Sequence, residues 1–503
     1  MITRVQYFLR SLTAICLPIL LTVSLNAQPK SITILHTNDI HASFVPHEAM
    51  WMNVKQKPMI GGLAELAFVA DSIRKVIGPE IMLDAGDMMT GNPITERMYG
   101  GAQGGALFEM MNRIHYDAWC PGNHDFDVSQ ENLRAITRIV SFPTVSANLV
   151  DDHGKFPVGN VPWAIIERGG LRIGVIGLIS SDLYNLVSQR NLVGIRVLDP
   201  AETMQKYIDV LLPKTDLLVA LTHQGVEDDS LMAEEVHGLN IIVGGHSHTR
   251  LPKPKVVNGV IIVQTGSNAE NLGELTISVE NHVVTGYNGK LIRLWPHHNL
   301  PPSPVSELAD SMQREIDKDF SEVLGTLKGD WKRGEGQTAI GTFLAEAQSS
   351  AAGAVVGFMN NYGIRRDVPA GPVTKKMIFE VLPFRNTLVT FSLTGKQLRG
   401  IMEFNIAKNP HIQIAGMSGT WKQLSDGGVR FTSIIIGGNE LDDEMTYPCA
   451  ASDYLVGEAR RYLGIELPQP IFLRQTVFES IVAAVRREGS IMPAVKYHIE
   501  QVH

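Results

Sequence analysis

The chain has 503 residues, of which 44% are hydrophobic and 19% are charged, and its formal net charge at pH 7 is −8. This length exceeds what one hydrophobic core supports, so we expect two or three domains. The composition is that of an ordinary globular protein. The negative charge argues against a nucleic-acid-binding surface, although local positive charge could still hold a small anionic substrate.

The first residues have the pattern of a secretory signal. Arg4 and Arg10 precede an apolar run that is shorter than a membrane span and ends in small residues. We expect cleavage near Ala27 and a secreted or periplasmic protein with no stable membrane span; an uncleaved membrane anchor is the alternative. The mature chain would keep only Cys120 and Cys449, far apart in sequence, so disulfides are not expected to stabilise it.

Residues 28–295 alternate short apolar runs with longer helical patterns. The runs end in Gly, Asn, Asp or His, and they read "SITILHTND", "IMLDAGD", "LRIGVIGL", "DLLVALTHQG" and "LNIIVGGHSH". This alternation predicts an α/β domain in which helices cover both faces of a sheet.

A proline-rich segment, "WPHHNLPPSPVS", interrupts this pattern within residues 296–325, which we interpret as a linker and a connecting helix. Ser303 and Pro304 are typical of a helix N-cap and first turn. The helix is expected to run through Leu324 and to end at Gly325. One apolar stripe would line it, formed by Leu308, Met312, Ile316 and Phe320. Residues 326–503 are expected to form a second, smaller α/β or α+β domain.

Side chains that bind metals follow several of the predicted strands. They are Asp39 and His41, Asp84 and Asp87, Asn123 and His124 in the turn "CPGNHDFD", His223, and the pair His246 and His248. In open α/β sheets the carboxyl ends of the strands face a common crevice, so residues distant in sequence can converge there. A single histidine is more often structural, but five loops that present only Asp, Asn and His indicate a functional site.

The residue types indicate metal chemistry. Imidazole and carboxylate ligands suit divalent ions such as Zn, Mn, Fe or Co, and soft thiolate ligands are absent from the set. A carboxylate can bridge two ions, and two ions about 3.5–4 Å apart suit phosphate-ester hydrolysis. Asp87 is the candidate for that bridge, whereas Asp84 either closes its turn or supports a ligand. No phosphate loop ending in GK[ST] and no GxSxG elbow is present, so nucleotide-driven work and serine hydrolysis lose support.

Six motifs of the first half occur in the order found in calcineurin-like metallophosphoesterases. They read "ILHTNDIH", "LDAGDMMTGNP", "GNHDFD", "FPTVSANL", "LTHQG" and "GGHSHT". The later motifs "MNNYGIRRDVPAG" and "LPFRNTLVTFSLTG" resemble the partner domain of the secreted 5'-nucleotidase family, which includes UDP-sugar hydrolases and 2',3'-cyclic-nucleotide phosphodiesterases. The resemblance covers nearly the whole mature chain. It implies a four-layer αββα metallophosphoesterase domain followed by a smaller substrate-binding domain.

The resemblance also implies the roles of the first-domain residues. One divalent ion would be held by Asp39, His41, Asp87 and His248, and a second ion by Asp87, Asn123, His223 and His246. His124 would stay unligated and face the substrate as a cationic or proton-donating group, with Asp127 orienting it. Asp125 is interpreted as a support for the loop.

By the same resemblance, the second domain selects the substrate, a small phosphate ester and most readily a nucleotide. Arg365 matches the family arginine that contacts phosphate, and Asn360 matches a substrate-site asparagine. Phe384 matches one of two aromatic residues that sandwich the base, and Tyr454 is the candidate for the other. Arg333 is a weaker phosphate candidate, because its register differs from the usual one.

Two positions depart from the family pattern. Arg460 stands near the place of the aspartate that holds the ribose hydroxyls, and Tyr362 replaces a glycine. Nucleoside specificity therefore rests on fewer matching residues than the metal site does. The leading hypothesis is a secreted two-metal phosphohydrolase of nucleotides. The alternatives are the same hydrolase acting on a UDP-sugar, sugar phosphate, pyrophosphate, cyclic phosphodiester or thiosulfate-type ester, and a non-catalytic binding protein that keeps the fold.

Overall fold

The computed structural model describes residues 30–502 except 55, 281, 298, 385 and 410. The expected signal segment, residues 1–27, lies outside the described residues. Within the described part of the chain, no helix combines the length and the apolar character needed to cross a membrane.

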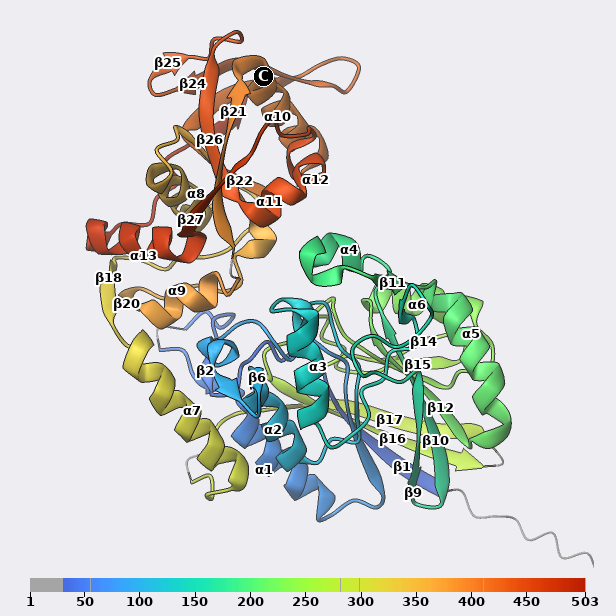
Figure 1. The fold of residues 1–503 in the computed structure, drawn as a ribbon. Helices are drawn as coiled ribbons and strands as arrows, with labels where there is room; N and C mark the ends of the chain where they lie inside the picture. The colour runs from blue at the N-terminus through green and yellow to red at the C-terminus, as the bar shows by residue number, and fades with distance from the viewer. Residues whose placement is uncertain are drawn as a thin grey trace, which may run out of the picture.

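Two stacked β-sheets form the centre of the first domain (Figure 1). The first sheet has the order β17-β16-β1-β4-β7, and the second has the order β14-β15-β13-β12-β10-β9. The strands of the first sheet are β1 (Lys30–Thr37), β4 (Glu80–Asp84), β7 (Ala118–Trp119), β16 (Asn271–Glu280) and β17 (Val283–Arg293). Those of the second are β9 (Trp163–Arg168), β10 (Leu171–Ile179), β12 (Leu217–His223), β13 (Ile241–Gly244), β14 (Lys255–Val257) and β15 (Val260–Val263). β1, β4 and β7 run parallel, as do β10, β12, β13 and β15, so both sheets direct carboxyl ends to one edge.

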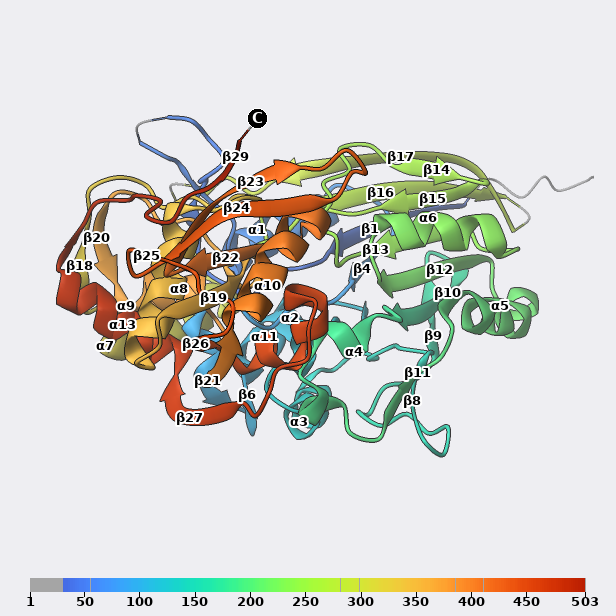
Figure 2. The ribbon, with the colours of Figure 1, turned by 90° about the horizontal axis from the view of Figure 1, so that it is seen from above.

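The central strands are apolar because both of their faces are buried. Ile34 and Leu83 of one sheet pack between the sheets in the same cluster as Val175 and Val219 of the other. The outer faces are covered by helices: α1 (Leu63–Arg74), α2 (Gly105–Ile114) and α3 (Gln130–Ile139) cover the first sheet, and α5 (Pro200–Leu211) and α6 (Val226–Glu235) cover the second (Figure 2). The four-layer αββα arrangement is confirmed. The single sheet covered on both faces, expected from the alternation alone, was wrong because each sheet covers one face of the other.

The connecting helix α7 (Pro304–Phe320) packs on the first domain against α1 and α2. Ser303 caps its N-terminus in a capping box with Ser306, and Pro304 occupies the first turn. The four residues of the predicted stripe are all buried in the core of the first domain. The helix ends at Phe320, not at Leu324, because Leu324 and Gly325 belong to strand β18 (Val323–Leu327), which pairs with β20 (Gly371–Thr374).

The second domain is built on a five-stranded sheet of order β22-β19-β26-β21-β27 (Figures 1 and 2). Its strands are β19 (Val356–Asn360), β21 (Thr387–Thr394), β22 (Ile412–Ala415), β26 (Thr446–Ser452) and β27 (Ile471–Thr476). One face packs on α8 (Ala339–Ala351) and α13 (Val477–Glu488), and the other on α10 (Gly395–Lys408), α11 (Asp453–Gly457) and α12 (Ala459–Leu463). Leu388 and Phe391 of β21 point to opposite faces, as alternation along a strand requires.

The two domains meet through helix α9 (Lys375–Val381) of the second domain. Phe379 is buried in the core of the first domain, with its ring centroid 5.6 Å from that of Phe320 in α7. The side-chain amide of Asn92 in the first domain donates a 3.2 Å hydrogen bond to Glu380. These contacts place the second domain over the edge of the first where the strand ends gather.

Candidate metal centre and substrate cleft

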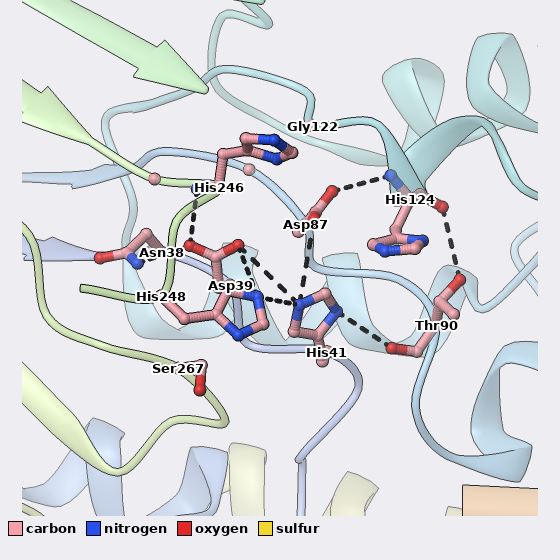
Figure 3. Close-up of polar contacts among 12 residues, drawn as sticks. Asn38, Asp39, His41, Asp87, Thr90, Gly122, His124, His246, His248 and Ser267 are labelled. Atoms are coloured by element: carbon pink, nitrogen blue, oxygen red, sulfur yellow. Dashed lines mark hydrogen bonds and ion pairs between the residues drawn. The ribbon is translucent and has the colours of Figure 1, made fainter. Parts of the chain in front are cut away.

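The side chains predicted to bind metals come together at the carboxyl edge of the two sheets. Figure 3 shows five of them, Asp39, His41, Asp87, His246 and His248. β1, β4 and β7 lead into the loops of Asp39, Asp87 and Asn123, and β12 and β13 lead into those of His223 and His246. Several of these residues have left-handed backbones, namely Asp39, His41, Asp87, His246 and His248. A positive φ is uncommon outside glycine, although Asp, Asn and His tolerate it best. These left-handed residues turn the chain after each strand and direct the side chains of the loops toward a common point.

One group of donor atoms surrounds Asp39. The Nε2 atoms of His41 and His248 lie 3.8 and 3.3 Å from Asp39 Oδ1, and 2.9 Å from each other. Asp87 Oδ2 lies 3.9 Å from His41 Nε2. Asp39, His41 and His248 have one donor atom each within 4.8 Å of the others, a separation that a shared ion can span.

A second group shares Asp87 with the first. Asp87 Oδ2 lies 3.2 Å from Nε2 of His223, and Asp87, His223 and His246 have donor atoms within 4.8 Å of one another. The Asn123 side-chain oxygen lies 3.0 Å from Nδ1 of His246. Asp87 therefore lies between the two groups.

The hydrogen bonds of this cluster direct one ring nitrogen of His41 and one of His223 at its centre. Nδ1 of His223 lies 2.6 Å from the carbonyl oxygen of Ala85, and Nδ1 of His41 lies 3.2 Å from that of Thr90. Since a carbonyl only accepts, each Nδ1 atom donates to it, and the Nε2 atoms of His41 and His223 are the ring nitrogens that face the candidate ligand cluster. Among the described residues, Asp39 Oδ1 and His223 Nε2 are buried without a hydrogen-bond partner. Converging oxygen and nitrogen atoms that lack hydrogen-bond partners fit a divalent cation.

Asp84 and Asp125 support the loop of Asp87 from behind. Burial raises the pKa of Asp84 to about 8, and its carboxyl closes the turn by accepting from the Thr37 hydroxyl and the Gly86 N–H. The Asp125 carboxyl accepts the N–H groups of Asp87, Met89 and Gly122, and burial raises its pKa to about 7. Neither residue belongs to a group of candidate ligands.

His124 lies beside the metal-binding cluster with one nitrogen paired to a carboxylate. Its Nδ1 lies 2.7 Å from Asp127 Oδ2, which also accepts a 2.6 Å hydrogen bond from the Thr90 hydroxyl. Its backbone N–H donates to Asp87 Oδ1. Burial disfavours the charged imidazole, but the carboxylates of Asp127 and Asp87 outweigh burial and raise the pKa of His124. The pair can therefore present a protonated imidazole to an anion.

The second domain closes the site from the opposite side and leaves a cleft of about 1530 Å³. Arg365 Nη2 lies 3.3 Å from His41 Nε2, and the Phe384 ring centroid lies 5.6 Å from that of His124. Asn360 is buried at the end of β19 and lines the cleft. The Tyr454 hydroxyl donates a 3.1 Å hydrogen bond to the Asn185 carbonyl of the first domain. The structure thus brings all four predicted substrate residues to the cleft that the candidate metal ligands line.

Comparisons with known proteins agree with this architecture. A calcineurin-like phosphoesterase model matches residues 32–250, and a 5'-nucleotidase C-terminal domain model matches residues 323–463. The chain belongs to the metallophosphoesterases that carry a C-terminal 5'-nucleotidase domain. It is accordingly a metal-dependent phosphoester hydrolase.

Relatives match over most of the chain. A 5'-nucleotidase of Vibrio cholerae is 28% identical over 83% of both chains, and Protein UshA of Yersinia enterocolitica is 26% identical over 84% of both. Among solved structures, a 5'-nucleotidase precursor of Thermus thermophilus matches with a TM-score of 0.81 and 25% identity, covering 94% of this chain and 99% of that one. The sulfate thiohydrolase SoxB of Thermus thermophilus shares the fold, with a TM-score of 0.77, 18% identity, and coverage of 94% and 96%.

The two departures from the family pattern differ in their relation to the cleft. Arg460 is exposed, forms an ion pair with Glu466, and is not among the residues that line the cleft. Its neighbour Arg461 does line the cleft, as do Glu458 and the exposed Tyr362. Nothing in the sequence distinguished Arg461 from Arg460, because only the turn of α12 decides which arginine faces inward.

Sequence reasoning also missed Thr90. This residue contacts both the His41 ring and the Asp127 carboxylate, but in "GDMMTGNP" it stands beside glycine, proline and asparagine as any loop threonine would. A threonine next to glycine carries no periodicity or ligand chemistry that could have marked it.

Proposed function

We propose that this protein is a secreted two-metal hydrolase that removes phosphate from nucleotides. The observation that carries the proposal is that candidate substrate residues of the second domain lie against candidate catalytic and metal-binding residues of the first. Arg365 and Phe384 of the second domain lie against His41 and His124 of the first. A phosphate at the metal-binding cluster and a planar base against Phe384 would use both at once. Secretion rests on the N-terminal pattern of residues 1–27.

The residues would divide the metals between two positions. Asp39, His41, Asp87 and His248 would hold one ion, and Asp87, Asn123, His223 and His246 would hold the other. When bound, such a pair of ions lowers the pKa of a water and neutralises charge on phosphoryl oxygens. The carbonyl groups of Ala85 and Thr90 accept from Nδ1 of His223 and His41, which orients Nε2 of each ring toward the metal positions.

His124 would act on the substrate, not on the metals. Its Nδ1 is engaged by Asp127, which leaves Nε2 as the nitrogen that can hold a proton toward the ester. A positioned imidazolium neutralises developing charge and gives its proton to the departing alkoxide. Arg365 would bind another phosphoryl oxygen from the opposite wall of the cleft, because a guanidinium offers several N–H groups in one plane.

A second candidate keeps the hydrolase and changes the leaving group. Arg460 stands near the place of the ribose-binding aspartate of the family pattern, and the next residue, Arg461, lines the cleft. This replacement favours a substrate other than a simple nucleoside monophosphate, such as a UDP-sugar, a cyclic phosphodiester or a sugar phosphate.

Metal analysis combined with a panel of phosphate esters tests the proposal. Purified mature protein is expected to contain or require two divalent ions per chain, and a chelator should abolish its activity. Nucleoside monophosphates should have the highest kcat/KM in the panel. Higher kcat/KM for a UDP-sugar or cyclic diester would select the second candidate. Full activity in metal-free protein with chelator present would contradict the mechanism, and metal binding without hydrolysis of any ester would indicate a binding protein.

A further inference from the structure

Thr90 has an unfavourable backbone conformation at the centre of the site. Its φ is 67°, and it is the one β-branched residue among the non-glycine residues with positive φ in the described part of the chain. A branched Cβ makes this region costly, whereas glycine enters it freely. Thr90 is also buried, with 5% relative exposure. Such a conformation persists where surrounding contacts fix it, and these contacts indicate what the residue does.

The side chain of Thr90 contacts the Asp127–His124 pair. Its hydroxyl donates a 2.6 Å hydrogen bond to Asp127 Oδ2, and the same oxygen lies 2.7 Å from His124 Nδ1. The His124 carbonyl lies farther from the hydroxyl, at 3.5 Å. Since a hydroxyl has one proton, the shorter contact with Asp127 takes it. Two donors therefore hold one carboxylate oxygen of Asp127.

The backbone carbonyl of Thr90 contacts the candidate metal ligand His41. The Thr90 carbonyl oxygen lies 3.2 Å from Nδ1 of His41 (Figure 3). The next residue, Gly91, packs so tightly that a Cβ there would lie 2.1 Å from the His41 carbonyl oxygen. The left-handed turn at Thr90 lets its carbonyl face His41 while its hydroxyl faces Asp127. One residue thus joins a candidate metal ligand to the candidate acid.

We propose that Thr90 is a positioning residue for the hydrolysis: its hydroxyl fixes the Asp127 carboxylate so that His124 keeps one ring orientation toward the substrate. This inference rests on the proposed function of His124. A threonine that merely shaped the loop would be replaceable by glycine, because glycine adopts this backbone with less strain and keeps the carbonyl contact with His41. Glycine would remove the hydroxyl that donates to Asp127, together with the methyl group of the threonine.

Two substitutions separate the hydroxyl from the backbone. Thr90→Gly removes the hydroxyl and relieves the strain, so we expect an unchanged or higher Tm together with a kcat on adenosine monophosphate that falls about 10–100-fold, the range for groups that orient a functional side chain. KM should change less than about threefold. Thr90→Ser keeps the hydroxyl without the branched Cβ, and should recover kcat to within about threefold of the wild type.

The leaving group gives a readout that a structural role would not move. A nucleoside alkoxide needs a proton to depart, whereas nitrophenolate departs readily without one. Thr90→Gly should therefore lower kcat on adenosine monophosphate several-fold more than on nitrophenyl phosphate. Metal content should match the wild type, because the carbonyl of residue 90 remains. Thr95→Ala is the matched control, since Thr95 is a buried threonine of the same segment whose hydroxyl bonds to the Asn92 carbonyl and not to the His124 side of the site.

The inference is wrong if Thr90→Gly keeps the wild-type kcat, if Thr90→Ser loses as much as Thr90→Gly, or if both substrates lose equally. A wild type that hydrolyses no ester would refute the proposed function instead. In that case crystal structures of the wild type and Thr90→Gly still test the positioning. We expect the Asp127 carboxylate and the His124 ring to change orientation in the variant, and identical orientations would refute the role of the hydroxyl.

Discussion

The two walls of the cleft are held in place by different means. In the first domain, the Asp125 carboxyl accepts from two N–H groups of the Asp87 loop and from the Gly122 N–H, and the His223 ring is held by the Ala85 carbonyl. In the second domain, the Arg365 guanidinium contacts the Tyr362 carbonyl at 3.4 Å, and it also contacts His41 across the cleft. Phe384 likewise has its aromatic contact across the cleft, with His124.

This difference explains why the candidate metal ligands stand in sequence motifs whose residue types indicate their chemistry, whereas the candidate substrate residues do not. A wall held by buried hydrogen bonds within short loops needs Asp, Asn, His and Gly at fixed spacings, and these spacings appear as motifs. A wall whose contacts lie across a domain junction depends on tertiary placement, and single residues such as Tyr362 can change there without disturbing the fold. We expect substitutions in the first wall to affect turnover and those in the second to affect KM.

The largest effect is expected at Asp87, which lies between both groups of candidate ligands. Asp87→Ala should abolish hydrolysis and lower the content of both metals, because Oδ2 faces His223 and His41. Asp87→Asn keeps the shape and an acceptor for the His124 N–H, and it should also be inactive. Metal content measured by mass spectrometry, with circular dichroism to verify folding, checks this. Asp125→Asn is the control and should keep measurable activity; equal losses at positions 87 and 125 would contradict the assignment.

The next effect separates catalysis from metal binding. His124→Ala should lower kcat about 10²–10⁴-fold, the range for a positioned acid–base group, while metal content stays near that of the wild type. Asp127→Asn should also lower kcat, but by a smaller factor, because Asp127 orients the His124 ring without touching the substrate. Loss of one metal in His124→Ala would show instead that His124 is a ligand, an outcome that its position beside His41 and Asp87 makes worth measuring.

Much of the first wall was predictable from sequence because it depends on local rules. The apolar runs predicted β1, β4, β10, β12 and β13, and the rule that strand ends converge predicted the cluster that follows them. The packing of two sheets was not predictable from alternation, since strands buried on both faces read alike in one sheet or in two. The end of α7 at Phe320 was missed because pairing of β18 with β20 outweighed the helical pattern.

The second wall was predictable only through its resemblance to known motifs. Phe384 stands in an apolar run, and a phenylalanine there is usually part of a core; only the domain junction exposes its ring to His124. The same holds for Tyr454, whose partner Asn185 is 269 residues away in sequence. Contacts of that range leave no local pattern, so the residues that choose the substrate are those that sequence reasoning identifies least.

A moderate effect on nucleotide recognition is expected at Phe384. Stacking of a base on an aromatic ring contributes about 1–3 kcal/mol in single-stranded nucleic-acid sites, so Phe384→Ala should raise KM for adenosine monophosphate roughly tenfold or more. Nitrophenyl phosphate needs only the metal site and should change little. Kinetics with both substrates check this. An unchanged ratio of the two kcat/KM values would remove the support for a nucleotide substrate and leave the broader phosphohydrolase.

The smallest effect is expected from the hydroxyl of Tyr454, which joins the two walls. Tyr454→Phe keeps the ring and removes one hydrogen bond to the Asn185 carbonyl. Such a bond contributes about 0.5–1.5 kcal/mol net, which corresponds to a rise of about two- to tenfold in KM for a nucleotide if the bond favours the closed cleft. Tyr454→Ala also removes the ring and should raise KM further, if that ring contacts the base as Phe384 is proposed to do. Steady-state kinetics of the two variants separate these contributions. Equal KM values for Tyr454→Phe and Tyr454→Ala would mean that Tyr454 joins the domains and contributes no aromatic contact, which would leave Phe384 as the sole aromatic platform among the residues proposed for substrate binding.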